Sequence, residues 1–301
     1  LHRLIRRQRQ MCIRDSLREY LEELGNEVYE TDLGEFIIQK LKSKPTHITS
    51  PSIHVAREQV AELLEKITGK HVDKNDIEDM VAIVKELLRR KYVEADVGIS
   101  GANVIAADTG AVVIIENEGN ARLATGLPPV HIVVAGIEKI VPTFQDAMKV
   151  AEVIWRYANY KMPSYVNIIA GPSKTGDIEK TITFGAHGPR EFHLVLVDNG
   201  RSKAAKDPVL KEALYCLRCG ACMYACPTWR VYGGFWGGDV YVGGIGVIWT
   251  AITRGIEEAY PHSLLCVYAG NCVEQCPLHI NTPEMIREIR KRYFEMYKSK
   301  K

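Results

Sequence analysis

The stretch Cys216-Leu-Arg-Cys219-Gly-Ala-Cys222-Met-Tyr-Ala-Cys226-Pro227 decides how this chain is organised. Its spacing, C-x2-C-x2-C-x3-C-P, is that of bacterial ferredoxins, in which the fourth cysteine binds the other cluster of a pair. Three thiolates two residues apart on a tight loop can bind three corners of one cubane. The proline then turns the chain, so that the fourth cysteine points elsewhere. The motif therefore predicts a domain that holds two iron–sulfur clusters.

A second, related motif lies toward the C-terminus. It reads Cys266-Val-Tyr-Ala-Gly-Asn-Cys272-Val-Glu-Gln-Cys276-Pro277 and matches the first, except that Ala269 replaces the middle cysteine. Crossed ligation assigns four thiolates to one cluster and three to the other: Cys216, Cys219, Cys222 and Cys276 to the first, and Cys226, Cys266 and Cys272 to the second. Four thiolates predict a [4Fe–4S] cluster. Three leave two alternatives, a [3Fe–4S] cluster or a [4Fe–4S] cluster whose fourth iron binds water or another side chain.

Two other interpretations of these cysteines are weaker. Zinc sites favour paired C-x2-C units and do not require two C-P ends. Inert core thiols do not explain why seven of the 8 cysteines are spaced so tightly between Cys216 and Cys276. The first residues of the chain lack the apolar segment of a signal peptide. Clustered thiols then favour a metal in a reducing, cytoplasmic compartment over disulfides.

Composition excludes several classes of protein. The chain has 301 residues, with Lys+Arg 39 and Asp+Glu 37, so its net charge is +2. This near-neutral balance argues against binding nucleic acid through bulk charge. Hydrophobic residues at 46% and charged residues at 25% are globular values. The longest uncharged run, residues 240–253, is shorter than the roughly 20 apolar residues that cross a bilayer, so we expect a packed loop and helix and no transmembrane segment.

The chain divides into four parts. Residues 1–16 contain the run Met11-Cys-Ile-Arg-Asp-Ser16, which resembles read-through of a sequencing adapter, and we expect them to be non-native. Residues 17–200 alternate helical periodicity with short β-branched runs, which predicts an α/β layered domain. Residues 201–208 are expected to be a linker, and residues 209–298 an α-helical domain that holds both clusters.

A polar segment of the α/β domain is a candidate anion site. It reads Gly171-Pro-Ser-Lys-Thr-Gly-Asp-Ile and follows a predicted strand. Small residues with free N–H groups can bind a phosphate or carboxylate, and the candidate residues are Ser173, Lys174, Thr175, Asp177 and, nearby, His187. The segment is not a P-loop, because the order G-x4-G-K-[ST] is absent. The alternative is a strand-to-helix turn in which Asp177 caps the helix. No catalytic residue is assigned.

Other polar residues of this domain are expected to be structural. Four histidines lie beside apolar strand residues and are expected to be satisfied core side chains, and none is assigned to a metal: His47, His54, His131 and His193. The acidic run Glu116-Asn-Glu-Gly-Asn could supply carboxylates, but we expect a solvated loop.

Several longer motifs resemble the lactate-utilisation (LUD) domain family. They are Glu30-Thr-Asp-Leu-Gly-Glu-Phe-Ile, Pro45-Thr-His-Ile, Pro51-Ser-Ile-His, Glu116-Asn-Glu-Gly-Asn, Pro128-Pro-Val-His, Gly171-Pro-Ser-Lys-Thr-Gly-Asp-Ile-Glu and His187-Gly-Pro-Arg-Glu. With the cysteine domain, they are similar to the iron–sulfur subunit of the bacterial and archaeal L-lactate oxidation complex. Two departures stand out: the chain begins inside the LUD domain, as if N-terminally truncated, and the second motif lacks the family's compact C-x2-C-x3-C-P. Its C-x5-C-x3-C-P is similar to the iron–sulfur subunits of succinate dehydrogenase and fumarate reductase, where it accompanies a three-iron cluster.

The resemblance implies a fold and a role. The fold is a layered α/β domain related to sugar-phosphate isomerases and coenzyme A transferases, followed by a ferredoxin-like helical domain. The role is relay of electrons from L-lactate, as a subunit of an oxidoreductase, with catalysis expected in partner subunits. The implied partners are those subunits and an electron-accepting protein or quinone-linked partner, and no nucleic acid. Such partners would hold the chain at the inner face of the membrane.

Two alternatives stay open at this point. In the first, the α/β domain itself binds and transforms a small anionic substrate, with the clusters as its redox outlet. In the second, the clusters are structural parts of a regulatory or nucleic-acid module, which the near-zero net charge argues against.

Overall fold

Short runs of β-branched residues form a parallel sheet in the first half of the chain. In the computed structural model, which describes residues 3–6, 17–158 and 161–298, five strands pair in parallel in the order β11-β6-β3-β1-β2. They are β1 (Arg3–Arg6), β2 (Glu27–Glu30), β3 (Val97–Ser100), β6 (Val130–Gly136) and β11 (Glu191–Val197). Counted along the chain, the order is 2-1-3-4-5, as in doubly wound sheets that bind ligands outside the carboxyl ends of their strands.

Strand β1 lies ahead of the domain boundary that the sequence predicted at residue 17. Its backbone pairs on one side with β2, with Arg3 opposite Glu27, and on the other side with β3, with Leu4 opposite Val97. The sheet of the α/β domain therefore includes residues 3–6. The adapter-like run at residues 11–16 lies outside the described residues.

A second, mixed sheet packs on the first. Its order is β7-β4-β5-β8, and its strands are β4 (Val104–Ala106), β5 (Val112–Glu116), β7 (Ile140–Val141) and β8 (Tyr165–Ile169). Side chains of a strand alternate between its two faces. Accordingly, Val113 and Ile115 pack against α6 (Phe144–Tyr157), whereas Val112 and Ile114 pack toward Val133 of β6. Strand β5 is buried on both faces, which explains its continuous apolar run.

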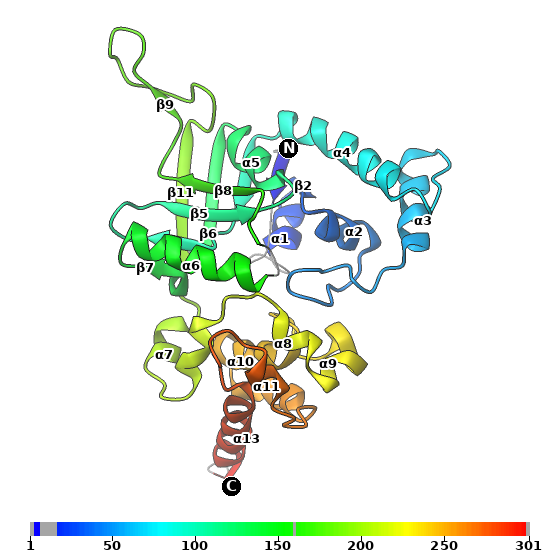
Figure 1. Ribbon diagram of the computed structural model, residues 1–301, viewed down its shortest axis with the longest axis vertical. Helices are drawn as coiled ribbons and strands as arrows, with labels where there is room; N and C mark the ends of the chain where they lie inside the picture. The colour runs from blue at the N-terminus through cyan, green and yellow to red at the C-terminus, as the bar shows by residue number, and fades with distance from the viewer. Residues whose placement is uncertain (1–2, 7–16, 159–160, 299–301) are drawn as a thin grey trace.

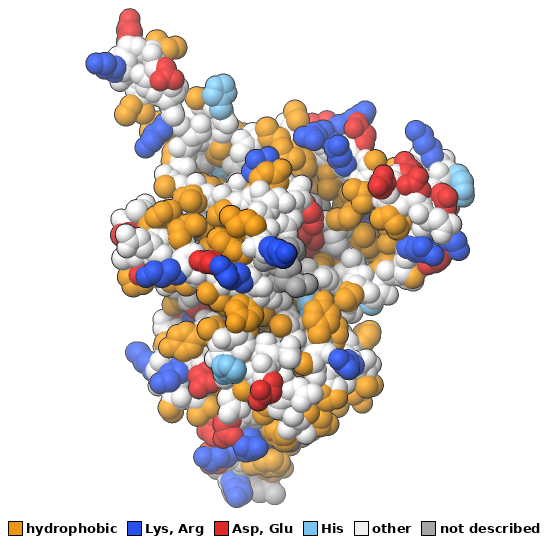
Figure 2. Space-filling view, in the orientation of Figure 1, with side chains coloured by type: hydrophobic (Ala, Val, Ile, Leu, Met, Phe, Trp, Pro, Cys, Tyr) orange, Lys and Arg blue, Asp and Glu red, His pale blue; other side chains and the backbone are white. Residues whose placement is uncertain are grey.

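In the described part of the chain, five further helices belong to the α/β domain and contact mainly β1, β2 and β3 or one another. They are α1 (Leu17–Glu23), α2 (Leu33–Leu41), α3 (Arg57–Thr68), α4 (Ile77–Glu94) and α5 (Asn120–Gly126). Met80, Val84, Leu88 and Tyr92 recur every fourth residue on one face of α4 and are buried against α2 and α3. Figure 1 shows α3 and α4 at one end of this domain. Figure 2 shows acidic and basic side chains interspersed on the visible face.

The polar segment after β8 forms a hairpin. Strand β9 (Lys174–Thr175) pairs antiparallel with β10 (Thr183–Phe184), and the hairpin projects away from the rest of the domain (Figure 1). The alternative of a strand-to-helix turn is therefore wrong, and Asp177 caps no helix. Cross-strand pairing of Thr175 with Thr183 replaces the helix, because these residues have higher β than helix propensity.

The second half of the chain is helical and lies beneath the α/β domain in Figure 1. Its elements follow α7 (Arg201–Ala205), which lies in the expected linker: η2 (Leu210–Tyr215), α8 (Ala221–Tyr224), α9 (Pro227–Tyr232), η3 (Gly233–Phe235), α10 (Gly243–Thr253), α11 (Ile256–Ser263), α12 (Asn271–Glu274) and α13 (Thr282–Lys298). The remaining short helix, η1 (Ile137–Lys139), follows β6 in the α/β domain.

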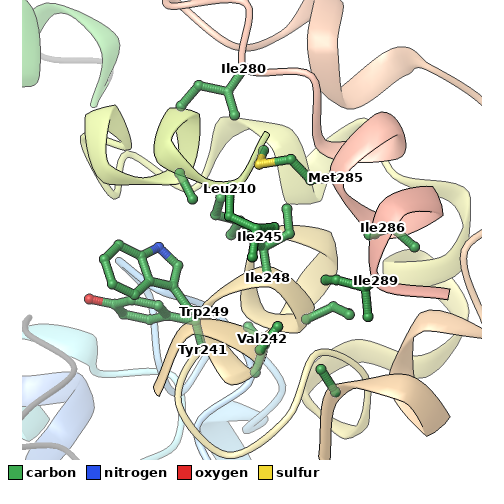
Figure 3. Packing of buried hydrophobic residues seen from close by; sticks show 14 of the residues in the cluster. Leu210, Tyr241, Val242, Ile245, Ile248, Trp249, Ile280, Met285, Ile286 and Ile289 are labelled. Carbon is green, nitrogen blue, oxygen red and sulfur yellow. The ribbon is translucent and has the colours of Figure 1, made fainter. Parts of the chain in front are cut away.

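Helix α10 is the centre of this domain. It is apolar on all sides, and Val247, Ile248 and Trp249 are fully buried among the other helices (Figure 3). The long uncharged run in the sequence therefore forms a packed loop and helix, as predicted. Among the described residues, no helix has both the length and the apolar character to cross a membrane.

Candidate metal centre

The two cysteine motifs fold into loops with the same backbone conformation. Arg218 in the first loop and Tyr268 in the second have φ angles of 61° and 58°. Two residues further on, Gly220 and Gly270 have φ angles of 79° and 81°, and each precedes a short helix, α8 or α12. Left-handed backbone at the same two positions makes the two loops a structural repeat.

Backbone hydrogen bonds repeat with the loops. The Cys216 N–H donates to the Ala213 carbonyl at 3.2 Å, and the equivalent Cys266 N–H donates to Ser263 at 3.1 Å. At the far end of each loop, the Cys226 N–H donates to Met223 at 3.0 Å and the Cys276 N–H donates to Val273 at 3.1 Å. These parallels place Ala269 in the second loop where Cys219 lies in the first.

The first-cluster thiols lie close enough for their charges to interact. Burial raises the pKa of Cys219, and the charges of Cys216 and Cys276 raise it further. Burial also raises the pKa of Cys222 well above its usual value, with the charges of Cys216 and Cys219 as the next causes. Cys276 belongs to the second motif, so its proximity to the first loop is what crossed ligation predicts.

The second-cluster thiols form the other group. Burial raises the pKa of Cys266, with a further increase from the charge of Cys226. Burial raises the pKa of Cys272 to about 11, followed by the charges of Cys226 and Cys266. None of the seven described cysteines is in a disulfide. The charge of Cys272 also raises the pKa of Cys222, so the two groups adjoin, and the predicted ligand sets stay predictions.

A cavity between the loops adjoins the second group. It has a volume of about 30 Å³, and its lining includes Cys226, Cys266 and Cys272 together with Ala269. Ala269 is exposed, whereas Cys219 is half-buried. The position of a fourth thiolate in the second loop is therefore occupied by a methyl group that faces solvent.

The donor set and its surroundings fit iron–sulfur clusters. Thiolates are the ligands of such clusters, and hydrogen bonds to sulfur tune their potential. The backbone N–H groups of Ala221, Tyr268 and Val273 lie against the sulfurs of Cys219, Cys266 and Cys272 and partly offset the effect of burial on their pKa values. Apolar core residues pack around five of the seven cysteines. Within the described ranges, no group of three or more His, Cys, Asp or Glu has the spacing for a single metal ion, whereas the thiolates of a cluster each bind a separate iron.

Each loop has one arginine bound to the carbonyl of its first cysteine. The Arg218 guanidinium donates to the Cys216 carbonyl, and the Arg290 guanidinium donates to the Cys266 carbonyl at 3.1 Å. Arg290 also lies 4.7 Å from the centre of the Tyr268 ring. A cation near each loop stabilises the negative charge of the thiolates there.

Arg218 is part of a buried ion cluster between the two domains. Glu138, just after β6, binds Arg201 of α7 through one oxygen and Arg218 through the other, the latter at 2.7 Å. The three side chains are only 5%, 2% and 6% exposed. Burial alone would raise the pKa of Glu138, but the neighbouring cations, Arg218 first, outweigh it and lower the pKa. The sequence carried no signal for this cluster, because its members come from three separate segments.

His47 covers the first loop from the side of the α/β domain. The N–H groups of Thr49 and Ser50 both donate to Nδ1 at 3.2 Å, so the proton is on Nε2, which donates to the Gly220 carbonyl at 3.3 Å. The ring lies 4.6 Å from the Tyr224 ring. The first loop is thus buried under the α/β domain, whereas the second is open to solvent at Ala269.

The other histidines differ from one another. His131 is fully buried, with Nε2 at 2.8 Å from Ser100 Oγ, and its Nδ1 has no hydrogen-bond partner among the described residues. Burial lowers the pKa of His131 to about 4. The prediction of a core histidine with its hydrogen bonds satisfied is therefore confirmed for His47. His131 is buried as predicted, but only one of its ring nitrogens is hydrogen-bonded to a described residue. For His54 and His193 the prediction is wrong, because both are exposed.

The candidate anion residues are only partly brought together. The His187 N–H donates to Ser173 Oγ at 3.3 Å, and the Asp177 N–H donates to Thr175 Oγ1 at 3.3 Å. The Ser173 N–H is already taken by the Pro189 carbonyl at 2.8 Å. Lys174 and Asp177 are exposed on the hairpin. Anion binding at Ser173, Lys174, Thr175, Asp177 and His187 stays a prediction.

The acidic loop is not solvated as expected. Glu116 is 1% exposed, and its carboxylate accepts the N–H groups of Ala121 at 2.7 Å and Arg122 at 2.9 Å. These N–H groups lie in the first turn of α5, which has no internal acceptor for them. The prediction is wrong for Glu116 because the helix end requires a buried acceptor.

Comparison with known families assigns both halves of the chain. Residues 4–197 match the family model described as LUD domain, and residues 212–280 match the 4Fe-4S dicluster domain. The chain belongs to the LUD domain family and joins that α/β domain to a helical, ferredoxin-like 4Fe-4S dicluster region. The predicted fold class and family resemblance are confirmed.

Three curated relatives share one name, "Lactate utilization protein B". The relative from Shouchella clausii is 38% identical over 278 residues, 92% of this chain and 56% of its own length. Those from Bacillus velezensis (38%) and Bacillus subtilis (36%) align over 283 residues, 93% of this chain and 57% of their own length. The chain spans about half the length of the curated relatives it matches. A DUF162 family protein from Deinococcus radiodurans is similar in structure with a TM-score of 0.24 and 19% identity, over 36% of this chain and 57% of that one.

Proposed function

We propose that this chain relays electrons through two unequal iron–sulfur clusters in a system that oxidises L-lactate. The observation that carries the proposal is the repeat of the two loops, in which Cys276 of the second motif lies near Cys219 and Cys226 of the first motif lies near Cys272. The lactate assignment is supported by the name that the relatives share.

The two clusters differ in their proposed type. Cys216, Cys219, Cys222 and Cys276 hold a [4Fe–4S] cluster, for which four thiolates suffice. Cys226, Cys266 and Cys272 hold a [3Fe–4S] cluster. Support for the second assignment is Ala269, whose methyl group replaces a thiolate at an exposed position of the loop. A [4Fe–4S] cluster with water on its fourth iron is the competing outcome.

The direction of electron flow follows from burial. Oxidation of a 2-hydroxy acid to a 2-oxo acid releases two electrons and two protons, and each cluster accepts one electron at a time. The first loop lies under the α/β domain at His47, and the second is exposed at Ala269. Electrons would therefore leave from the cluster that Cys226, Cys266 and Cys272 would hold, which is the one nearer solvent, to an acceptor protein or a quinone-linked partner.

Partner subunits complete the proposed system. Substrate oxidation takes place in them, and the chain works with them on the cytoplasmic side. A second candidate function gives the substrate chemistry to the α/β domain, on the strength of the contact between Ser173 and His187. Loss of substrate binding in Ser173→Ala and Asp177→Asn, with clusters intact, would favour this second function.

A redox titration tests the relay. The full chain is reconstituted anaerobically with iron and sulfide, and the spectra of both clusters are followed against applied potential. Each cluster should show one reversible one-electron step. In Cys272→Ser the first cluster should still be reduced by a small-molecule donor, but its reoxidation by a protein acceptor should slow markedly. Clusters that stay silent throughout the working range would overturn the proposal.

A further inference from the structure

A cavity of about 60 Å³ lies where the α/β domain meets the first cysteine loop. Ser100 at the carboxyl end of β3 and Lys139 just after β6 line one side, and Arg218 and Cys219 of the first loop line the other. One water needs roughly 10–15 Å³ of such volume. The cavity thus has room for several waters or one small organic molecule.

The position of the cavity matches the topology of the sheet. Parallel sheets of this strand order bind ligands in the crevice outside the carboxyl ends of their strands. Here β3 and β6 are neighbours in the sheet, with Val97 opposite Val130. Ser100, the last residue of β3, and Lys139, three residues after β6, line the cavity. The first cysteine loop closes this crevice from outside.

The cavity contains hydrogen-bond donors. Burial, followed by the charge of Arg218, lowers the pKa of Lys139 to about 7, and a bound carboxylate would favour the ammonium form. The neighbouring carboxylate of Glu138 is already bound by Arg201 and Arg218. Asn103 uses its side-chain carbonyl to accept the Ile115 N–H at 2.9 Å, which leaves its amide N–H groups as donors. The lining residues that the structure describes include no Asp or Glu.

The remaining wall is apolar. Ile114, Ile154 and Leu217 line the cavity together with these donors. A buried carboxylate requires a cation and hydrogen-bond donors, whereas a short carbon chain requires an apolar wall. This combination suits a small organic acid better than an inorganic anion.

We propose that this cavity binds a short-chain monocarboxylate, with its carboxylate at Lys139 and Asn103 and its carbon chain toward Ile114 and Leu217. Binding of a carboxylate rests on the cavity alone, and the choice of a 2-hydroxy or 2-oxo acid rests on the proposed function. Because Cys219 lines the cavity, the bound acid lies beside a ligand of the predicted first cluster.

Calorimetric titration of the reconstituted full chain tests this binding. Iron content is measured first, and sodium L-lactate, pyruvate and propionate are titrated at constant ionic strength set with sodium chloride. Lys139→Met should weaken binding of all three about tenfold or more, because a charge-assisted hydrogen bond is lost. The matched control, Lys85→Met on the exposed face of α4, should bind as the unmodified chain does.

A second measurement locates the acid. Pyruvate labelled with ¹³C in its carboxylate should give a ¹³C coupling to the reduced first cluster by electron–nuclear double resonance, and Lys139→Met should remove the coupling. No binding to the unmodified chain, unchanged binding in Lys139→Met, or an equal loss in Lys85→Met overturns the inference. A chain that holds clusters but binds no acid contradicts this inference alone, and a chain that binds the acid but holds no cluster contradicts the proposed function alone.

Discussion

Ala269 occupies the place in the second cysteine loop that Cys219 occupies in the first. Each follows a residue with a φ angle near 60°, 58° for Tyr268 and 61° for Arg218, and each precedes a glycine with a φ angle near 80°. The backbone at Ala269 therefore has the conformation of a cysteine ligand position, although its alanine side chain supplies no thiolate.

Ala269→Cys should complete the second site. A thiol at this position of an unchanged backbone provides a fourth ligand, so a three-iron cluster should become a [4Fe–4S] cluster. EPR of the oxidised protein should show the three-iron signal in the unmodified chain and its loss in the variant. Ala205→Cys, which adds a thiol at an exposed position of α7 outside both cysteine motifs, should keep the signal. An unchanged cluster type in Ala269→Cys contradicts the prediction.

Gly220→Ala and Gly270→Ala should differ although their backbones match. Both carry the strain of positive φ, on the order of 1–3 kcal/mol. A Cβ at Gly220 would lie 2.5 Å from Cε1 of His47, whereas a Cβ at Gly270 meets no atom within 4 Å. Gly220→Ala should therefore lower the melting temperature further and broaden the spectrum of the first cluster. Equal losses in both variants would show that His47 does not hold the first loop.

Glu138→Gln should destabilise the junction of the two domains. Removing one partner of a buried ion pair leaves uncompensated charge, at a cost of about 3–5 kcal/mol. Here both Arg201 and Arg218 would lose their carboxylate partner. Glu152→Gln, which removes the exposed pair with Arg156 on α6, should cost no more than about 1 kcal/mol. Urea unfolding of the two variants measures the difference, and similar costs would contradict the prediction.

His131 should make the fold sensitive to acid. Its pKa is lowered from 6.5 to about 4 by burial, so the folded chain takes up this proton less readily than the unfolded chain. The stability that neutral His131 provides is full above pH 6.5 and is lost as the pH falls toward 4. Between pH 7 and pH 5 this loss is about 2 kcal/mol.

His131→Gln removes the titrating ring, so its free energy of unfolding should fall less between pH 7 and pH 5 than that of the unmodified chain. His193→Gln changes an exposed histidine on β11 and should leave the pH dependence as it was. Denaturant unfolding at the two pH values gives the comparison. Parallel pH profiles for His131→Gln and the unmodified chain would contradict this role.

Local patterns in the sequence predicted the local structures well. The cysteine spacing predicted both loops, because ligand geometry there depends on neighbours a few residues apart. The helical periodicity of the α4 segment predicted a helix buried on one face, and the uncharged run around α10 predicted a helix buried on all sides. In both, the apolar residues lie on the faces that pack against the rest of the chain.

Contacts between distant segments were not predictable. His47 binds Gly220 across 173 residues, and Glu138 binds Arg218 across 80, so no local pattern marks either pair. The hairpin at β9 and β10 was missed for a related reason. Its two strands are short, and only their pairing, Thr175 with Thr183, decides between strand and helix.

The proposed inequality of the two clusters rests on the thiolate that the second loop lacks at Ala269. EPR of the anaerobically reconstituted, oxidised chain tests this inequality most directly, with iron and sulfide measured on the same sample. We predict a three-iron signal from the site of Cys226, Cys266 and Cys272 beside an EPR-silent [4Fe–4S] cluster at the site of Cys216, Cys219, Cys222 and Cys276. Two [4Fe–4S] clusters with indistinguishable spectra, and no three-iron signal, would contradict it.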